Sequence, residues 1–125
     1  MQQKRILIVD DESTITRLLK LNLEKTGDYI VREENKGSKA FETARKFKPH
    51  LILLDVMMPD MDGGDVAAQL QSDQVLKNAR IVFLTAAVKK EELSEKGGMI
   101  GGFPYIAKPL NVKGVLEEIE KQLAS

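Results

Sequence analysis

Three short runs of apolar residues, none interrupted by a polar residue, constrain the fold of this chain more than any other feature. The runs cover residues 6–9, 51–54 and 81–84. A strand that is apolar at every position must be buried on both faces, as strands are in a parallel sheet with helices on each side. The three runs therefore predict the central strands of such a sheet.

The rest of the chain alternates further strands with helices. Short strands are predicted at residues 29–31, at an edge of the sheet, and at 105–107. Helices are predicted at residues 13–26, 40–47, 64–71, 89–96 and 112–123. Five strands that alternate with five helices indicate an α/β fold, a doubly wound five-stranded parallel sheet between two helical layers. The length of 125 residues fits a single domain over residues 1–125.

The composition argues against several classes of function. Lys and Arg number 19, as do Asp and Glu, whereas a dedicated nucleic-acid binder normally has a basic excess. The chain has no cysteine, which excludes disulfides, thiolate zinc sites and thiol catalysis. Only four apolar residues precede the first aspartates, so neither a signal peptide nor a membrane span is expected. We expect a cytoplasmic protein that binds no membrane and no nucleic acid directly.

Polar residues directly follow four of the predicted strands. They are, in chain order, Asp10, Asp11, Glu12, Asp55, Thr85, Lys108 and Pro109. Ligands of open parallel sheets bind outside the carboxyl ends of the strands, so these residues are expected at one edge of the sheet. Singly, each has an ordinary explanation as a helix cap, a loop residue or a surface cation. It is their coincidence at one edge that indicates a functional site.

Three carboxylates brought together need compensating positive charge. If Asp10, Asp11 and Asp55 lie together, each close pair repels by roughly 4 kcal/mol at about 4 Å and an effective dielectric near 20. Lys108 supplies one positive charge and leaves a sum of about −2, which a divalent cation would balance. Oxygen ligands without His or Cys favour Mg²⁺ over zinc. A carboxylate beside Mg²⁺, a lysine and a hydroxyl such as that of Thr85 suits phosphoryl transfer to an aspartate.

Four segments carry a family resemblance. They are ILIVDDE at 6–12, LLDVMMPDMDG at 53–63, LTA at 84–86 and YIAKP at 105–109. Each is weak alone, but in this order and spacing they closely resemble the receiver domain of bacterial response regulators, the phosphoacceptor domain of two-component signalling. The resemblance covers residues 4–124. It implies a flavodoxin-like three-layer sandwich with strand order 2-1-3-4-5.

The resemblance also implies roles for residues at the predicted site. Asp55 would be the phosphoacceptor. Mg²⁺ would be held by Asp10, Asp11, Asp55 and the main-chain carbonyl of Met57. Lys108 would pair with the phosphoryl group.

Two further features are implied in the same way. The peptide bond between Lys108 and Pro109 would be cis. Thr85 and Tyr105 would form a switch pair. On phosphorylation the Thr85 hydroxyl would move toward a phosphoryl oxygen, and Tyr105 would turn inward.

In function, the resemblance implies a phosphoprotein of a two-component phosphorelay. The phosphoryl group would come from a sensor histidine kinase or a histidine phosphotransfer protein. The surface of the fourth helix, fifth strand and fifth helix would then signal to a downstream protein. Such a domain is not an enzyme, beyond promoting its own phosphorylation and dephosphorylation. We expect a monomer or a phosphorylation-dependent dimer, and no output domain within residues 1–125.

The sequence departs from the usual receiver pattern between the predicted fourth helix and fifth strand. Most receivers have a single Gly-Ala there, whereas this chain has Gly97, Gly98, Gly101 and Gly102. Either the glycines shorten the fourth helix and loosen the segment after it, or they shape a tight loop.

Single residues add two expectations. Met57 and Ala87 are apolar where polar side chains in relatives can position attacking water, so we expect slow self-dephosphorylation. His50 is the single histidine and precedes the third strand, where we expect a solvated loop residue.

Three other functions are alternatives to a phosphoacceptor domain for a fold of this kind, and the sequence fits each of them less well. A Mg²⁺-dependent phosphatase similar to the haloacid dehalogenases needs Asp-x-Asp, but Val56 and Met57 follow Asp55. A flavin mononucleotide binder needs a phosphate loop rich in Ser, Thr and Gly after the first strand, where Asp10, Asp11 and Glu12 would repel phosphate without a metal. A scaffold that has lost phosphorylation is disfavoured because all the core residues are present.

Overall fold

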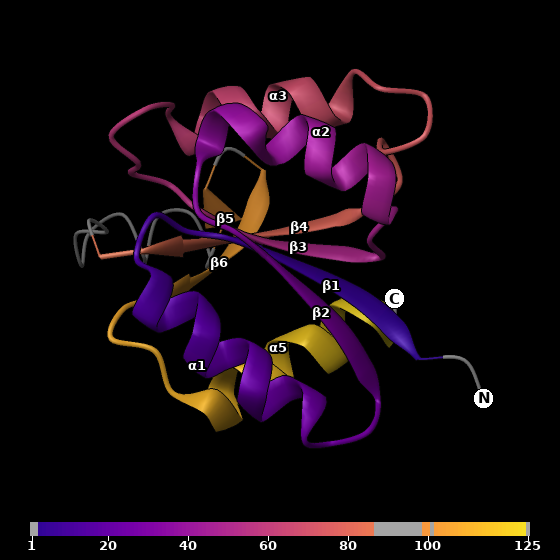
Figure 1. The fold of residues 1–125 in the computed structure, drawn as a ribbon, viewed down its shortest axis with the longest axis vertical. Coiled ribbons are helices and arrows are strands. Elements are labelled where there is room, and N and C mark those ends of the chain that lie inside the picture. The colour runs from indigo at the N-terminus through magenta and orange to yellow at the C-terminus, as the bar shows by residue number, and fades with distance from the viewer. Residues whose placement is uncertain (1–2, 87–98, 101, 125) are drawn as a thin grey trace.

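The computed structural model describes residues 3–86, 99–100 and 102–124, which form a three-layer α/β architecture (Figure 1). The strands are β1 (Lys4–Val9), β2 (Tyr29–Glu34), β3 (Leu51–Asp55), β4 (Arg80–Thr85), β5 (Met99–Ile100) and β6 (Phe103–Ala107). The described helices are α1 (Ser13–Glu24), α2 (Gly37–Phe47), α3 (Gly63–Gln71) and α5 (Val112–Ala124). Helices α1 and α5 cover one face of the sheet, and α2 and α3 cover the other (Figure 1).

The strand order is β2-β1-β3-β4-β6-β5, and the first five strands in this order are parallel. This confirms the expected five-stranded parallel sheet of order 2-1-3-4-5, with β6 as the fifth parallel strand. The prediction was incomplete, because β5 adds a short antiparallel strand beyond β6. Gly102, in the turn between β5 and β6, has a φ of 88°, a left-handed conformation that glycine adopts without strain.

Three sequence-based expectations concern residues outside the described ranges, wholly or in part. The predicted helix at 89–96 lies outside the described residues, and the described part of the chain contains four helices rather than five. Gly97, Gly98, Gly101 and Ala87 also lie outside the described residues.

The sheet is buried on both faces, as its apolar runs require. Leu7 and Val9 of β1 pack in the cluster under α2 and α3, whereas Ile6 and Ile8 pack in the cluster under α1 and α5. All four side chains are fully buried. Shortening any of them to alanine would cost about 2–5 kcal/mol of stability. The same alternation through β3 and β4 makes the sheet a rigid platform for the residues at its ends.

The prediction for His50 was wrong about its surroundings. The residue does precede β3 in a loop, but its imidazole is half-buried, and Nδ1 accepts a hydrogen bond from the backbone N–H of Arg5 at 2.9 Å. The backbone of His50 also joins β1 to β4, because its N–H donates to the Arg5 carbonyl and its carbonyl accepts from the Arg80 N–H. His50 is thus part of the sheet's amino-terminal edge.

Candidate functional site

The polar residues predicted at the carboxyl edge of the sheet do lie together there. Asp10 directly follows β1, Asp55 is the last residue of β3, Thr85 is the last residue of β4, and Lys108 directly follows β6. Asp10, Asp55 and Thr85 have exposed fractions of 0%, 4% and 3%. Three polar side chains are therefore buried at one edge of an otherwise apolar sheet.

Three carboxylates form the centre of this site. Ligand oxygens of Asp10, Asp11 and Asp55 lie within 4.8 Å of one another. The Lys108 ammonium approaches two of these residues, with Nζ 2.9 Å from Oδ2 of Asp10 and 3.6 Å from Oδ2 of Asp55. Nζ also lies 3.3 Å from Oε1 of Glu12, which was expected at this edge but has no role implied by the family resemblance. The Lys108 ammonium is thus shared by the carboxylates of Asp10, Glu12 and Asp55.

The positive charge falls short of what the cluster needs. Burial raises the pKa of the Asp55 carboxyl to about 6, and the charge of Asp10 adds to the rise. The Lys108 charge and the N–H of Met57, which donates to Oδ1 of Asp55 at 3.2 Å, oppose the rise without cancelling it. Although burial works against it, the ion pairs with Asp10 and Asp55 raise the pKa of Lys108. A further cation beside Asp55 would stabilise its charged carboxylate and lower its pKa.

The donor set fits a hard divalent cation. Oδ1 of Asp10 accepts the N–H of Glu12 at 3.0 Å, but Oδ2 is buried and receives no hydrogen bond within the described part of the chain. Its contact with Lys108 Nζ is an ion pair by distance that lacks hydrogen-bond geometry. A buried carboxylate oxygen that receives no hydrogen bond, in an all-oxygen cluster, suits Mg²⁺. Asp10, Asp11 and Asp55 could supply ligands from their side chains.

Gly63 lies against the backbone of Asp55 and Val56, where the loop after β3 folds back. The N–H of Gly63 donates to the Val56 carbonyl at 2.9 Å. A Cβ at Gly63 would lie 2.8 Å from Cα of Val56 and would overlap the carbonyl oxygen of Asp55. Only glycine allows this approach without a shift of the backbone that carries Asp55.

The loop between Asp55 and α3 is also tied to α2. The Asp60 carboxylate accepts hydrogen bonds from the N–H of Gly37 at 3.2 Å, the N–H of Ser38 at 3.1 Å and the hydroxyl of Ser38 at 2.9 Å. The Ser38 N–H is the main reason that the pKa of Asp60 lies below its usual value. Asp60 therefore caps the amino end of α2 from a distant loop.

The backbone of Asp10 is held from the neighbouring strand. Its N–H donates to the Glu34 carbonyl at 3.1 Å. The amide of Asn35 donates to the Asp10 carbonyl at 2.8 Å and to the buried Thr16 hydroxyl at 3.0 Å. Neither Asn35 nor Thr16 was singled out from the sequence, because their role depends on the contact between β1 and β2.

Thr85 and Tyr105 share one face of the sheet. Phe83 pairs with Tyr105 and Thr85 with Ala107 across β4 and β6. Since side chains two residues apart lie on the same face, Thr85 and Tyr105 both project toward the side of α2 and α3. Tyr105 is half-buried there. The N–H of Lys108 donates to the Thr85 carbonyl at 2.8 Å, and the Lys108–Pro109 peptide bond is cis.

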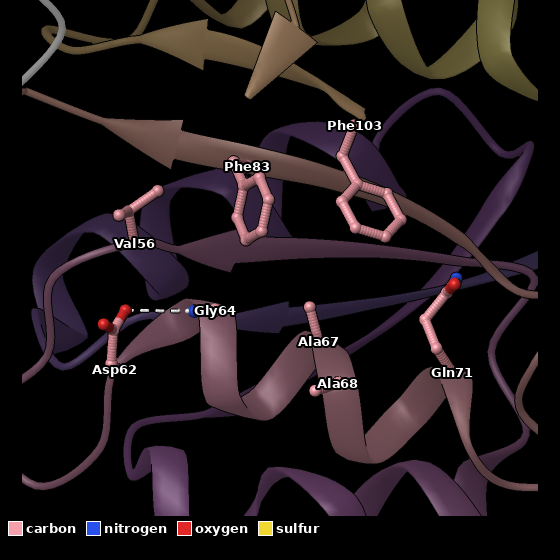
Figure 2. Close-up of a pocket in the computed structure, with 8 residues that line it drawn as sticks. All are labelled: Val56, Asp62, Gly64, Ala67, Ala68, Gln71, Phe83 and Phe103. Carbon is pink, nitrogen blue, oxygen red and sulfur yellow. Dashed lines mark hydrogen bonds between the residues drawn. The ribbon is translucent and has the colours of Figure 1, made fainter. Parts of the chain in front are cut away.

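An apolar pocket opens beside the loop that follows Asp55. Its volume is about 450 Å³, and Figure 2 shows its lining. Val56 and Asp62 lie at one end, Ala67, Ala68 and Gln71 of α3 form one wall, and Phe83 and Phe103 form the other (Figure 2). The two phenylalanine rings meet edge to face with centroids 5.6 Å apart. This pocket lies on the same face of the sheet as Thr85 and Tyr105.

The fold and the carboxylate cluster define a flavodoxin-like α/β protein with an acidic site at the carboxyl edge of its sheet. The family model for the response regulator receiver domain matches residues 6–120. The chain therefore belongs to the receiver-domain family of two-component response regulators.

Two curated relatives are transcriptional regulators. The alkaline phosphatase synthesis transcriptional regulatory protein PhoP of Bacillus subtilis is 41% identical over 113 residues, which cover 90% of this chain and 45% of that protein. The transcriptional regulatory protein PdtaR of Mycobacterium tuberculosis is 36% identical over 117 residues, covering 94% of this chain and 55% of that protein. The chain thus spans about half the length of these relatives.

Solved structures with the same fold include single receiver domains. The chemotaxis protein CheY4 of Vibrio cholerae superimposes with a TM-score of 0.83 at 26% identity, covering 96% of this chain and 98% of that one. A CheY-like receiver domain protein of Methanospirillum hungatei superimposes with a TM-score of 0.82 at 27% identity, covering 98% of this chain and 95% of that one. None of the described helices is long and apolar enough to cross a membrane.

Proposed function

We propose that this receiver domain accepts a phosphoryl group on Asp55 in a Mg²⁺-dependent reaction and so works as a phosphorylation switch in the cytoplasm. The observation that carries the proposal is the cluster of the buried Asp10 and Asp55 with the half-buried Lys108, in which one ammonium neutralises part of the carboxylate charge. Burial and the charge of Asp10 raise the pKa of Asp55, and Lys108 does not fully offset them, so a further cation would stabilise the charged carboxylate. Phosphoryl transfer needs such a concentration of cations around the transferred group.

The step is a transfer from nitrogen to oxygen. A carboxylate oxygen of Asp55 attacks the phosphorus of a phosphohistidine, and a P–O bond forms as the P–N bond breaks. The electron pair of the broken bond stays on the imidazole, which leaves as a neutral ring because its other nitrogen carries a proton. Lys108, now 3.6 Å from Asp55, would pair with the new phosphoryl oxygens.

Mg²⁺ would be held by the side chains of Asp10, Asp11 and Asp55 and by the main-chain carbonyl of Met57. When bound, it supplies positive charge that neutralises phosphoryl oxygens. The chain's own residues set its position: Asn35 holds the Asp10 carbonyl, and Gly63 holds the backbone beyond Asp55.

The response to phosphorylation would pass through Thr85 and Tyr105. Both lie on the face of the sheet covered by α2 and α3, and Thr85 ends the strand that pairs with β3 through Asp55. Movement of the Thr85 hydroxyl toward a phosphoryl oxygen would open space for the Tyr105 ring to turn inward. The surface that includes β6 and α5 would then differ between two states, which a downstream protein could distinguish.

An enzyme with a separate substrate is the less favoured function. Asp55 is followed by Val56, which is half-buried and lines the apolar pocket, and by Met57, whose side chain is 68% exposed. Neither side chain can act as the second acid of a hydrolase. We propose that the domain promotes only its own phosphorylation and dephosphorylation.

The phosphodonor would dock on α1 beside the site. Ile15, Leu18 and Leu19 of α1 form a small apolar pocket of about 200 Å³ with Lys108, Pro109 and Leu110. Leu18 and Leu21 have exposed fractions of 54% and 59%. A partner that brings phosphohistidine to Asp55 must cover the surface next to Lys108. The apolar surface of α1 around Leu18 lies next to Lys108 and could therefore contact such a partner. A histidine kinase or a phosphotransfer protein is the proposed partner.

Leu18→Asp tests the docking surface. The variant should slow transfer from a phosphorylated histidine kinase while leaving phosphorylation by the small donor phosphoramidate unchanged. Val75→Asp is the matched control, because Val75 is 50% exposed and lies outside this surface. Equal kinase transfer to both variants would exclude docking at Leu18.

The proposed function is tested by titration with beryllofluoride, which mimics a phosphoryl group on aspartate, followed by amide NMR. Saturable shifts at Asp55, Thr85, Tyr105 and Lys108 that require Mg²⁺ are expected, and Asp55→Asn should abolish them. Shifts that reflect Mg²⁺ alone would instead support a scaffold that no longer uses phosphorylation.

A further inference from the structure

The amino-terminal edge of the sheet carries a polar cavity, at the opposite end of the strands from Asp55. It lies near the start of β1, where the N-terminus is marked in Figure 1. Its volume is about 540 Å³, and its lining includes Arg5, Lys48, His50 and Arg80. No carboxylate is among the described residues that line it.

The backbone fixes the basic residues of this cavity. Arg5 lies in β1, His50 precedes β3, and Arg80 begins β4. The N–H of His50 donates to the Arg5 carbonyl at 2.8 Å, and the N–H of Arg80 donates to the His50 carbonyl at 3.0 Å. The backbones of three basic residues, from three separate segments of the chain, are thus held next to one another by hydrogen bonds.

The Arg5 guanidinium is oriented by the end of α2. Its Nε donates to the carbonyls of Phe47 at 3.1 Å and Lys48 at 2.8 Å. Lys48 ends α2 in a left-handed conformation with a φ of 55°. The two terminal nitrogens of Arg5 have no partner among the described residues, so they remain able to donate.

His50 adds a neutral donor. Because Nδ1 accepts the N–H of Arg5, the proton of the neutral ring resides on Nε2, which has no hydrogen-bond partner in the described ranges. Burial lowers the pKa of His50, and the positive charges of Arg5 and Lys4 lower it further. The environment of the imidazole is therefore net positive.

We propose that this cavity binds a phosphate dianion, either free inorganic phosphate or the phosphate end of a small organic phosphate. Arginine forks and a lysine ammonium are the groups that bind phosphate oxygens best, and the N–H of His50 and the amide of Asn78 add neutral donors. The cavity has the size of small-molecule sites. Apolar contact from Val75 and Leu123 would suit the organic part of a phosphate ester.

The single histidine of the chain makes the test direct, because its imidazole gives one resolved NMR signal that reports on the cavity. Protein freed of Mg²⁺ is titrated with inorganic phosphate and, separately, with adenosine monophosphate, while sodium chloride at matched ionic strength provides the baseline. A saturable shift of the His50 ring, with a dissociation constant on the order of 1 mM or below, is expected. Tighter binding of the nucleotide identifies an organic phosphate as the ligand, and equal binding identifies inorganic phosphate.

Two variants and a control locate the site. Lys48→Gln and Arg80→Gln should each weaken binding several-fold, whereas Lys39→Gln makes the same charge change on an exposed residue of α2 outside the cavity and should have no effect. A His50 shift no larger than that with chloride, or equal weakening in all three variants, would overturn the proposal. Saturable binding of a short polyglutamate peptide without any binding of phosphate would also overturn it.

Discussion

The Lys108 ammonium forms its shortest ion pair with Asp10, with Nζ 2.9 Å from Oδ2 of that fully buried carboxylate. The same nitrogen lies 3.6 Å from Oδ2 of the proposed acceptor, Asp55. Asp10 therefore holds the Lys108 ammonium close to Asp55 but not in its shortest contact. A phosphoryl group on Asp55 would add negative charge within reach of an ammonium that is already in place.

Removing the Lys108 charge should raise the pKa of Asp55 above its value of about 6, because the charge of Lys108 opposes the effects of burial and Asp10. Lys108→Gln tests this by carboxyl NMR titration of Mg²⁺-free protein. Lys113→Gln, an exposed change on α5, controls for net charge. If the pKa of Asp55 is unchanged in Lys108→Gln, the Lys108 ammonium has no influence on the protonation of Asp55.

Asp55→Asn should stabilise the Mg²⁺-free protein at neutral pH. Burial and Asp10 raise the pKa of Asp55 from 3.8 to about 6. The stability that Asp55 contributes is thus fully present below pH 3.8 and is lost as pH rises toward 6. At pH 7 the charged carboxylate destabilises the fold, and its removal should add on the order of 1–3 kcal/mol.

Urea denaturation at several pH values measures this effect. The stability advantage of Asp55→Asn should be largest at pH 7 and should shrink as the pH falls through 6, where wild-type Asp55 takes up its proton. An advantage that is constant with pH would show that the substitution acts through packing. Saturating Mg²⁺ should stabilise the wild type more than the variant.

Gly63→Ala should damage the acid site, whereas Gly64→Ala should spare it. A Cβ at Gly63 overlaps the backbone of Asp55 and Val56, so the loop must shift, at a cost of about 1–3 kcal/mol. At Gly64 the nearest atom would be Oδ1 of Asp62 at 3.7 Å, an ordinary contact. Mg²⁺ titration by NMR should show weaker binding in the first variant only. Similar Mg²⁺ affinity in both would mean that the close approach at Gly63 does not position the ligands.

Met57→Asn should shorten the lifetime of the phosphorylated domain several-fold. The Met57 side chain is 68% exposed two residues beyond Asp55, and a thioether cannot orient an attacking water as an amide can. Loss of the phosphoryl group with time can be followed by intact-mass spectrometry after the donor is removed. A lifetime equal to that of the wild type would mean that the Met57 side chain does not limit hydrolysis of the phosphoryl group.

The residues at the centre of the site could be predicted from the sequence because each follows an apolar run directly. Asp10, Asp55, Thr85 and Lys108 come after strands whose carboxyl ends meet at one edge of a parallel sheet, so neighbours in space follow from position along the chain. The family resemblance implied a separate role for each of them, which the structure does not test. Periodicity located the described helices within a few residues, because their apolar faces repeat at helical spacing.

Residues that support the site could not be predicted in the same way. Asp60 caps α2 from a loop 22 residues away, and Asn35 reaches the Asp10 carbonyl across 25 residues. These contacts depend on how the layers pack, which no local pattern encodes. The expectation for His50 was wrong for a related reason, since its hydrogen bond with Arg5 exists only once β1 and β3 are paired. The β5 strand was missed because two residues among glycines carry no periodic signal.

Phosphorylation of Asp55 itself tests the central claim most directly. The protein would be incubated with phosphoramidate with and without Mg²⁺, and its intact mass would be measured for the wild type and for Asp55→Asn. We predict that the wild type gains the mass of one phosphoryl group only when Mg²⁺ is present and that the variant gains none. A wild type that stays unmodified with Mg²⁺, or an Asp55→Asn variant that gains the same mass, would contradict the account.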